Sequence, residues 1–428
     1  MKVALLGNTC NNNFSFLRYL LDLGVDAHLY LYSNEGRREE NPLHAPKWDT
    51  FNSNSFENKV SYLDVPNGLI SVIGRPDKLC LPLNLSKFSQ TLSKYDLCVG
   101  SGLSPAIFFR LKRSLDIFYP YGTGLEWVND NETKMNLLTL NLEWPFRKLL
   151  TYLQLQGLRK TKRVTNWLPG ITEEVFKKYS INTHNMHIPA YYAEEINAQP
   201  NQLLKNLNEH LIKRITDQNR FKIFSFMRHY WVYRKNLNYK NTWMNVNKNN
   251  DLLIRGFANF INKFPEKNCT LFLSEWGIDL EDSRQLVKEL NIENQVAWMP
   301  LMPRSYITYI FSNYANLAVG EFVISENEHW GNTAWECLAL GVPFMQTVNY
   351  TENSFKKFFG YGLPPEILNV KTFEDVSSHI NETYNKSNKS CIKLSRNIDW
   401  FKKYNGHSLT RNWINIFEDL VSEKKKKK

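Results

Sequence analysis

Short apolar runs alternate with amphipathic segments along the first 190 residues of the chain. Lys2–Leu6, Val25–Tyr32, Asp96–Val99 and Asp116–Tyr119 have the length and the apolar, aromatic or β-branched content of buried strands. Phe14–Gly24 instead places its apolar residues at helical spacing and ends on a glycine. Strand–helix alternation of this kind predicts a parallel sheet with helices on both faces.

Turns that contain glycine follow several of these strands. Gly7, Asn8 and Thr9 follow the first predicted strand, and Gly122 and Thr123 lie in the turn after the fourth. Ligands of parallel sheets bind at the carboxyl ends of the strands, which is where these turns lie. All five residues are therefore candidate ligand contacts.

A second alternation of the same kind begins at Phe221. Its predicted strands are Phe221–Phe226, Thr270–Ser274, Gln295–Met299, Asn316–Gly320 and Val342–Gln346, and its predicted helices are Asp251–Phe264, Ser283–Leu290, Tyr306–Ser312 and Asn332–Leu340. The sequence thus predicts an α/β fold with two domains in tandem, residues 1–190 and 221–395, joined by a polar linker at 191–220. A ligand is expected in the cleft between their facing strand ends.

The composition is typical of a soluble globular protein: 428 residues, 43% of them hydrophobic and 22% charged. The six cysteines are scattered, with no CxxC, which argues against a disulfide framework or a zinc site and favours the cytoplasm. The sequence contains no apolar run of about 18 residues, so no membrane span is predicted. Lys424–Lys428 supply five of the +11 net charges, leaving +6 (11 − 5), and are expected to form a solvated tail.

The most informative segment surrounds Gly331, where a helix is predicted to start after a loop that carries Glu328. Asn332 and Thr333 suit a helix N-terminus, whose exposed backbone N–H groups attract a phosphate. Glu336 lies about one turn further into the helix, where its carboxylate can accept hydrogen bonds from two ribose hydroxyls. The competing interpretation is an ordinary loop, helix and strand of a Rossmann-like domain.

The residues that make this segment specific are Ser325, Glu328, Gly331, Glu336, Gly341 and Pro343. At these spacings they resemble the signature of glycosyltransferase family 4, the group 1 glycosyl transferases, which are retaining enzymes with the GT-B fold. Phe224–Arg228 and Lys248–Phe257 also look like the family's strand that ends in an arginine and its lysine-led helix. The resemblance covers roughly residues 221–347 and is looser over 1–190.

The resemblance implies a GT-B fold, with two Rossmann-like domains that face each other across a cleft. Residues 1–190 would bind the acceptor and residues 221–395 the nucleotide sugar, and the helices of 396–428 would cross back to the first domain before the lysine tail. The implied activity is retaining, metal-independent transfer of a sugar from a nucleotide-sugar donor to a glycan or lipid-linked acceptor, as in polysaccharide biosynthesis. No cofactor and no metal site are predicted, since no Asp-x-Asp follows a strand.

Specific roles follow from the resemblance. Arg228 and Lys248 would hold the donor diphosphate and stabilise the charge on the leaving group, and Glu328 would contact the transferred sugar or its phosphate, so these three are the candidate catalytic residues. The candidate donor-binding residues are Glu336, Gly331, Asn332, Thr333, Gly7, Asn8 and Thr9. The alternative interpretations are that Arg228 is a surface arginine and that Lys248 is an ordinary lysine in the first turn of a helix. Glu328 and Glu336 could likewise be capping carboxylates.

The chain also departs from the family pattern. Nineteen residues separate Arg228 from Lys248, so Lys235 or Lys240 could take the lysine role, and this aromatic, basic insertion could line the acceptor site through Tyr230 and Trp231. The turn with Gly122 and Thr123 lacks the family's histidine, and its residues are further candidate acceptor contacts. The donor base, the sugar and the linkage stay open.

Three alternatives remain beside the transferase. A GT-B epimerase or phosphorylase shares the fold, and so would a non-catalytic nucleotide-sugar-binding protein. A nucleic-acid-binding protein would need a recognition motif, and the sequence has none. The predicted helix at 143–163 carries leucines between basic residues. It either docks on the anionic inner face of the membrane or packs on its own sheet.

Overall fold

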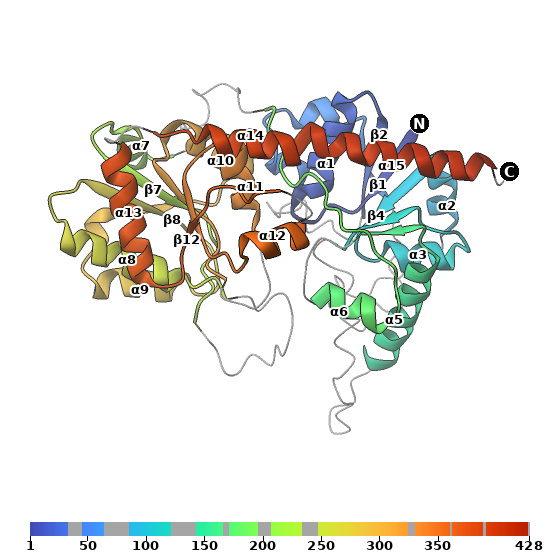
Figure 1. The fold of residues 1–428 in the computed structure, drawn as a ribbon, viewed down its shortest axis with the longest axis horizontal. Coiled ribbons are helices and arrows are strands. Elements are labelled where there is room, and N and C mark those ends of the chain that lie inside the picture. Colours follow the sequence, from blue (N-terminus) through green and yellow to red (C-terminus); the bar gives the residue numbers. More distant parts are fainter. Residues whose placement is uncertain are drawn as a thin grey trace.

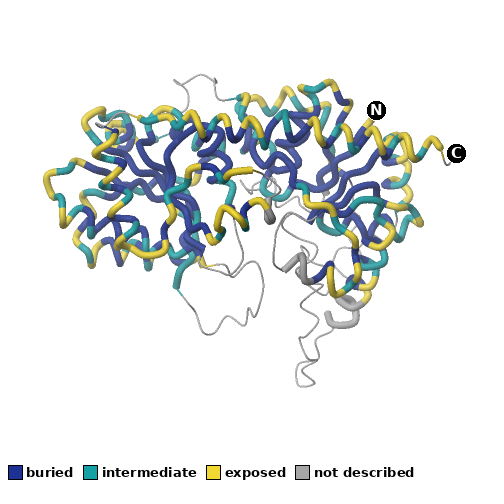
Figure 2. The backbone as a smooth tube through the Cα atoms, viewed as in Figure 1, coloured by how far each residue is buried: buried dark blue, intermediate teal, exposed yellow. Residues whose placement is uncertain are grey.

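Two parallel sheets organise the protein, one in each half of the chain (Figure 1). The structure is a computed structural model, and it describes residues 1–32, 45–63, 85–120, 143–165, 171–195, 207–232, 247–323, 330–359, 362–387 and 391–426. The predicted α/β class is confirmed. The central strands of both sheets are buried, and apolar clusters pack on the two faces of each sheet (Figure 2).

The N-terminal sheet has the strand order β3-β2-β1-β4-β5-β6, with every neighbouring pair parallel. Its strands are β1 Lys2–Leu6, β2 Asp26–Tyr32, β3 Val60–Leu63, β4 Leu97–Gly100, β5 Ile117–Phe118 and β6 Arg163–Val164. Its helices are α1 Asn12–Asp22, α2 Ser86–Leu92, α3 Ser104–Arg110, α5 Glu143–Lys160 and α6 Ile171–Lys178, with 3-10 turns η1 Thr9–Asn11, η3 Pro46–Trp48 and η4 Ser53–Phe56. The chain winds outward from β1 in both directions, so the loop after β1 lies at the switch point where ligands bind in such sheets.

The C-terminal sheet repeats this topology, with the order β12-β11-β10-β7-β8-β9 and all pairs parallel. Its strands are β7 Phe221–Ser225, β8 Cys269–Ser274, β9 Val296–Met299, β10 Leu317–Val319, β11 Phe344–Gln346 and β12 Leu368–Asn369. Its helices are α7 Glu209–Thr216, α8 Asn250–Lys263, α9 Leu280–Glu289, α10 Arg304–Tyr314, α11 Asn332–Leu340, α12 Glu352–Phe359 and α13 Phe373–Ser387, with a 3-10 turn η10 Glu293–Gln295. Here β7 and β10 flank the switch point.

The last two helices join the halves. Helix α14 (Ser395–Tyr404) packs beside α11, and α15 (Gly406–Lys426) continues along the N-terminal half, next to α1 (Figure 1). On α15, the rings of Trp413 and Phe417 lie 5.6 and 6.2 Å from that of Phe16. The indole N–H of Trp413 donates to the His187 carbonyl at 2.8 Å. Apolar packing therefore ties the end of the chain to its beginning.

The structure differs from the sequence expectations in two segments. The expected linker at 191–220 contains α7, because Leu211 and Ile215 face the C-terminal core at helical spacing. The expected solvated tail is helical up to Lys426, and Lys424 Nζ lies 2.9 Å from Oδ1 of the buried Asp116. A cation in the last turn of a helix is favourable, and here it also neutralises a buried carboxylate.

No helix in the described part of the chain is long and apolar enough to cross a membrane.

Candidate functional site

The two halves touch where the loop after β1 meets the start of α11. The Asn332 side-chain amide donates to the Cys10 carbonyl at 3.3 Å. Both segments lie at the carboxyl edge of their sheet, because η1 follows β1 directly and α11 follows β10. The contact thus brings together two of the segments that the sequence marks as donor contacts.

Asparagines shape the loop after β1. Gly7 adopts a left-handed φ of 83°. The buried side chain of Asn8 donates from its Nδ2 to Asn11 Oδ1 at 2.7 Å, and its Oδ1 accepts from the Phe14 N–H at 3.0 Å. The Asn13 amide donates to the Gly7 carbonyl at 2.7 Å. The side chain of Asn8 therefore holds the loop in shape, which leaves the loop backbone as the part that can face a ligand.

Charged side chains of the C-terminal half gather around this loop. Burial raises the pKa of the Cys10 thiol to about 11. Among the nearby charges, Glu321 also raises this pKa, whereas Arg304, Lys248 and Arg228 lower it. Arg228, which follows β7, and Lys248, which precedes α8, therefore both lie close enough to Cys10 for their charges to act on its thiol.

The two cations differ in their surroundings. Lys248 is buried, its N–H donates to the Tyr230 carbonyl at 2.7 Å, and its ammonium forms an ion pair with Glu321. Arg228 is half-buried, its guanidinium lies 5.6 Å from the centre of the Tyr230 ring, and no described residue forms an ion pair with it. Arg228 is therefore the more exposed of the two cations.

Glu321 is a site residue that the sequence analysis missed. It follows β10 after one glycine, and its carboxyl carbon lies 2.9 Å from where a Cβ on Gly331 would stand. A side chain at the N-cap position of α11 would therefore have to displace the end of the Glu321 side chain. An acidic residue directly after a predicted strand was the available signal.

Helix α11 starts as the sequence predicts, at Asn332, and it ends at Leu340 before Gly341. Its N-cap residue is Gly331, which has no side chain to cap the first turn. Asn332 and Thr333 are partly exposed at the start of the helix, whereas the residues from Ala334 to Leu340 are buried. The N-terminal turn is therefore the most accessible part of α11.

Glu336 is not open to solvent. It is 5% exposed, and its Oε1 accepts a hydrogen bond from Arg304 Nε at 2.6 Å. Burial raises the pKa of this carboxyl, and the charge of Arg304 opposes the rise. Arg304, which the sequence analysis did not single out, therefore occupies Oε1 of the predicted ribose ligand.

The first residues of the long insertion are anchored to α9. The Trp231 N–H donates to Asp279 Oδ2 at 2.7 Å, and its indole N–H donates to Ser283 Oγ at 2.8 Å. The neighbouring His229 is buried, with Nδ1 2.8 Å from the same Ser283 oxygen. Trp231 therefore fixes the start of the insertion against the beginning of α9.

Several predicted site residues lie outside the described residues: Glu328, Gly122, Thr123, Lys235 and Lys240. Within the described ranges, no group of three or more His, Cys, Asp or Glu side chains is placed to hold a metal ion.

The same two-sheet arrangement occurs in solved structures of other proteins. Sucrose-phosphate synthase from Thermosynechococcus elongatus superposes with a TM-score of 0.59 at 13% identity, over 99% of this chain and 100% of that one. A glycosyltransferase from Rickettsia africae ESF-5 gives 0.56 at 10% identity, over 98% of each chain. The fold is GT-B.

A UDP-N-acetylglucosamine 2-epimerase has the GT-B arrangement too, with a TM-score of 0.51 at 8% identity over 97% of this chain and 94% of that one. Neither a family model nor a curated protein matches the sequence. At identities this low, the superpositions establish the fold alone, and the reaction has to be argued from the site.

Proposed function

We propose that the protein is a glycosyltransferase that takes a sugar from a nucleotide-sugar donor. The observation that carries this proposal is the convergence of Arg228, Lys248 and the first turn of α11 on the loop after β1. Each of these groups attracts an anion, and together they fit the diphosphate of a donor.

The chemistry follows from the charges. Breaking the bond between sugar and phosphate leaves negative charge on the diphosphate, and fixed cations with a helix N-terminus stabilise it as it develops. Arg228 and Lys248 provide the cations, and the N–H groups at Asn332 and Thr333 provide the helix end. In this proposal the leaving group is stabilised without a metal ion.

The finer assignments rest on the resemblance to glycosyltransferase family 4. They are a retaining reaction, ribose binding by Glu336, a contact of Glu328 with the transferred sugar, and a glycan or lipid-linked acceptor near Gly122, Thr123 and Tyr230. The enzyme would work in the cytoplasm on polysaccharide precursors.

One helix supports a membrane-bound acceptor. On α5, Leu149 and Tyr152 are 49% and 54% exposed, and the exposed cations Arg159 and Lys160 end the same helix. Apolar side chains beside cations suit the surface of an anionic bilayer. We therefore propose that this face of α5 docks on anionic lipid.

The test is calorimetric titration of the full chain with a panel of nucleotide sugars and nucleoside diphosphates. One nucleotide class should bind, and Arg228→Ala should weaken it about tenfold or more, because a charge-assisted phosphate contact is lost. Arg255→Ala, at an exposed arginine on α8, is the matched control and should bind like the wild type.

Product analysis separates the enzyme classes. Transfer requires an added acceptor, whereas an epimerase converts the bound nucleotide sugar without one. If no nucleotide of the panel binds the wild-type protein, the proposal fails.

A further inference from the structure

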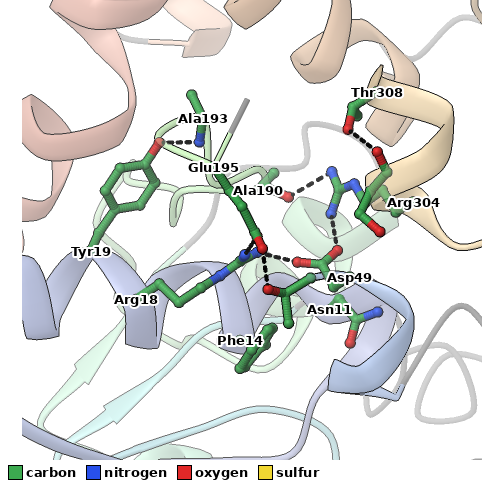
Figure 3. A network of polar contacts seen from close by, with 12 residues as sticks. Asn11, Phe14, Arg18, Tyr19, Asp49, Ala190, Ala193, Glu195, Arg304 and Thr308 are labelled. Carbon is green, nitrogen blue, oxygen red and sulfur yellow. Dashed lines mark hydrogen bonds and ion pairs between the residues drawn. The ribbon is translucent and has the colours of Figure 1, made fainter. Parts of the chain in front are cut away.

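A buried series of charged side chains joins the two halves of the molecule (Figure 3). It runs from Arg18 on α1 through Asp49, directly after η3, to Arg304 at the start of α10 and Glu336 on α11. The exposed fractions of these side chains are 2%, 1%, 10% and 6%, in that order. Charges buried this deeply are costly unless they stay paired, so each of these side chains depends on its neighbours in the series.

Arg304 uses all three of its guanidinium nitrogens in hydrogen bonds. Its Nε donates to Glu336 Oε1 at 2.6 Å, its Nη1 to Asp49 Oδ1 at 3.1 Å and its Nη2 to the Ala190 carbonyl at 3.1 Å. Its guanidinium also lies 4.9 Å from the centre of the Tyr191 ring. Because a guanidinium is planar and its N–H groups keep fixed directions, the contacts of Nη1 and Nη2 set the direction in which Nε points. Residues of the N-terminal half therefore orient the N–H group that Glu336 receives.

Glu336 has one carboxylate oxygen held and one left over. Its Oε1 accepts from Arg304 Nε, whereas no described residue donates to its Oε2. Burial raises the pKa of this carboxyl, and the charge of Arg304 opposes the rise and so favours the ionised form. An ionised carboxylate accepts stronger hydrogen bonds than a neutral acid does. Arg304 thus fixes the side chain of Glu336 and leaves Oε2 for a hydroxyl group.

We propose that Arg304 and Asp49 are positioning residues for the recognition of the nucleotide's ribose. Arg304 holds Glu336 so that its Oε2 accepts a ribose hydroxyl, and Asp49 holds Arg304 from the other half of the chain. The inference rests on the proposed function, because it takes Glu336 as the ribose ligand. It makes the N-terminal half contribute to the recognition of a nucleotide that the C-terminal half binds.

Two variants weaken the series without leaving a buried charge alone. Arg304→Lys keeps the positive charge, but a single ammonium cannot reproduce the three directed contacts of the guanidinium. After Asp49→Asn, Arg18 keeps Glu195, whose Oε2 lies 2.7 Å from Arg18 Nη1. Arg304 keeps Glu336 in the same variant. The asparagine also has nearly the volume of the aspartate.

The experiment compares ribonucleotides with their 2′-deoxy counterparts on the full chain. Uridine, guanosine and adenosine diphosphates and the three 2′-deoxy forms are titrated calorimetrically into the wild type and Glu336→Gln. For the nucleotide class that binds, the wild type should prefer the ribose form about tenfold or more, because the deoxy form leaves a charged acceptor without its hydroxyl. Glu336→Gln should lower this preference to about threefold or less, because a neutral acceptor forms a weaker hydrogen bond.

The same preference measures the positioning role. Arg304→Lys should lower it to about threefold or less, and Asp49→Asn should give an intermediate value, because Arg304 then keeps its other contacts. A variant that only lost stability would bind both forms of the nucleotide with their ratio unchanged. The matched controls are Arg284→Lys and Asp26→Asn, whose side chains form ion pairs exposed to solvent, and both should keep the wild-type preference.

A second measurement uses the wild-type protein alone, in case the variants do not fold. It is an experimental structure with the nucleoside diphosphate that binds. Arg304 Nε should stay on Oε1 of Glu336, with a ribose hydroxyl within hydrogen-bond distance of Oε2. A ribose that takes Oε1 in place of Arg304 overturns the inference.

The outcomes separate the positioning role from the proposed function. Equal binding of the ribose and deoxy forms to the wild type, or a full preference in both Arg304→Lys and Asp49→Asn, overturns the positioning role and leaves the diphosphate site standing. Absence of nucleotide binding to the wild type overturns the proposed function and the positioning role with it.

Discussion

Glu321 places a negative charge where the proposal puts the donor diphosphate. Its carboxylate pairs with Lys248 and lies against Gly331 at the start of α11. Among Arg228, Lys248 and Glu321 the charge is therefore +1 (2 − 1) before a donor arrives. The carboxylate pairs with the ammonium that, in the proposal, holds a phosphate.

Glu321→Gln is expected to raise the affinity for nucleoside diphosphates several-fold, because it removes a like charge from beside the phosphates. The gain in affinity should be smaller at about 0.3 M salt than at about 0.05 M, because salt screens the repulsion between Glu321 and the phosphates. Titration calorimetry at both salt concentrations measures it.

The matched control is Glu275→Gln, in the same half, whose carboxylate pairs with Arg284 at the surface. Weaker binding to Glu321→Gln would contradict the interpretation and would mean that Glu321 holds Lys248 in position for the ligand.

The residues that the sequence analysis missed share one property. Asp49, Arg304 and Glu321 act through partners that folding brings close, and Arg304 and Asp49 are 255 positions apart in the chain. No spacing rule links such residues. Arg228, Lys248 and Glu336 could be singled out because they belong to a local pattern around strands and a helix start, and their roles stay predictions.

Helix α5 shows how an element can satisfy two interpretations at once. One face packs on α3 so closely that a Cβ on Gly157 would stand 2.0 Å from the Pro105 carbonyl oxygen. The other face exposes Leu149 and Tyr152, and the Tyr152 ring meets that of Phe109 edge-on at 6.4 Å. The helix therefore packs on its own domain and still exposes apolar side chains.

The Leu149→Gln/Tyr152→Gln double variant should lose most of the binding to vesicles of equal parts phosphatidylglycerol and phosphatidylcholine, because it removes the exposed apolar contact. Vesicle co-sedimentation measures the bound fraction. Leu363→Gln, at a leucine that is 62% exposed in the other half, is the control and should bind like the wild type.

Pure phosphatidylcholine should bind little wild-type protein. Equal binding of the double variant and the wild type to anionic vesicles would contradict the proposal that α5 docks on anionic lipid.

Secondary structure could be predicted best where a segment is buried on both faces. Strand β1 and helix α11 have the predicted bounds, and β7, β8 and β9 differ from them by one residue at one end. Strands β3 and β6 were missed because Val60–Leu63 has a single buried residue and Arg163–Val164 is only two residues long. Helix α7 was missed because its apolar face is confined to Leu211 and Ile215.

At the scale of the whole molecule, the two sheets repeat one strand order, and the loop after β1 touches the start of α11. Strand–helix alternation predicted both sheets, since each strand and the helix that follows it form a local unit. The sequence could not predict how closely the halves meet. That depends on the contacts of Arg304 with Asp49 and Ala190, and on α15 against α1.

The central claim is that Arg228, Lys248 and the first turn of α11 hold the donor diphosphate. The most direct test is an experimental structure of the protein with the nucleoside diphosphate that binds it. The account predicts phosphate oxygens within hydrogen-bond distance of Arg228, of Lys248 and of a backbone N–H at Asn332 or Thr333. A nucleotide whose phosphates lie away from all three groups would contradict it.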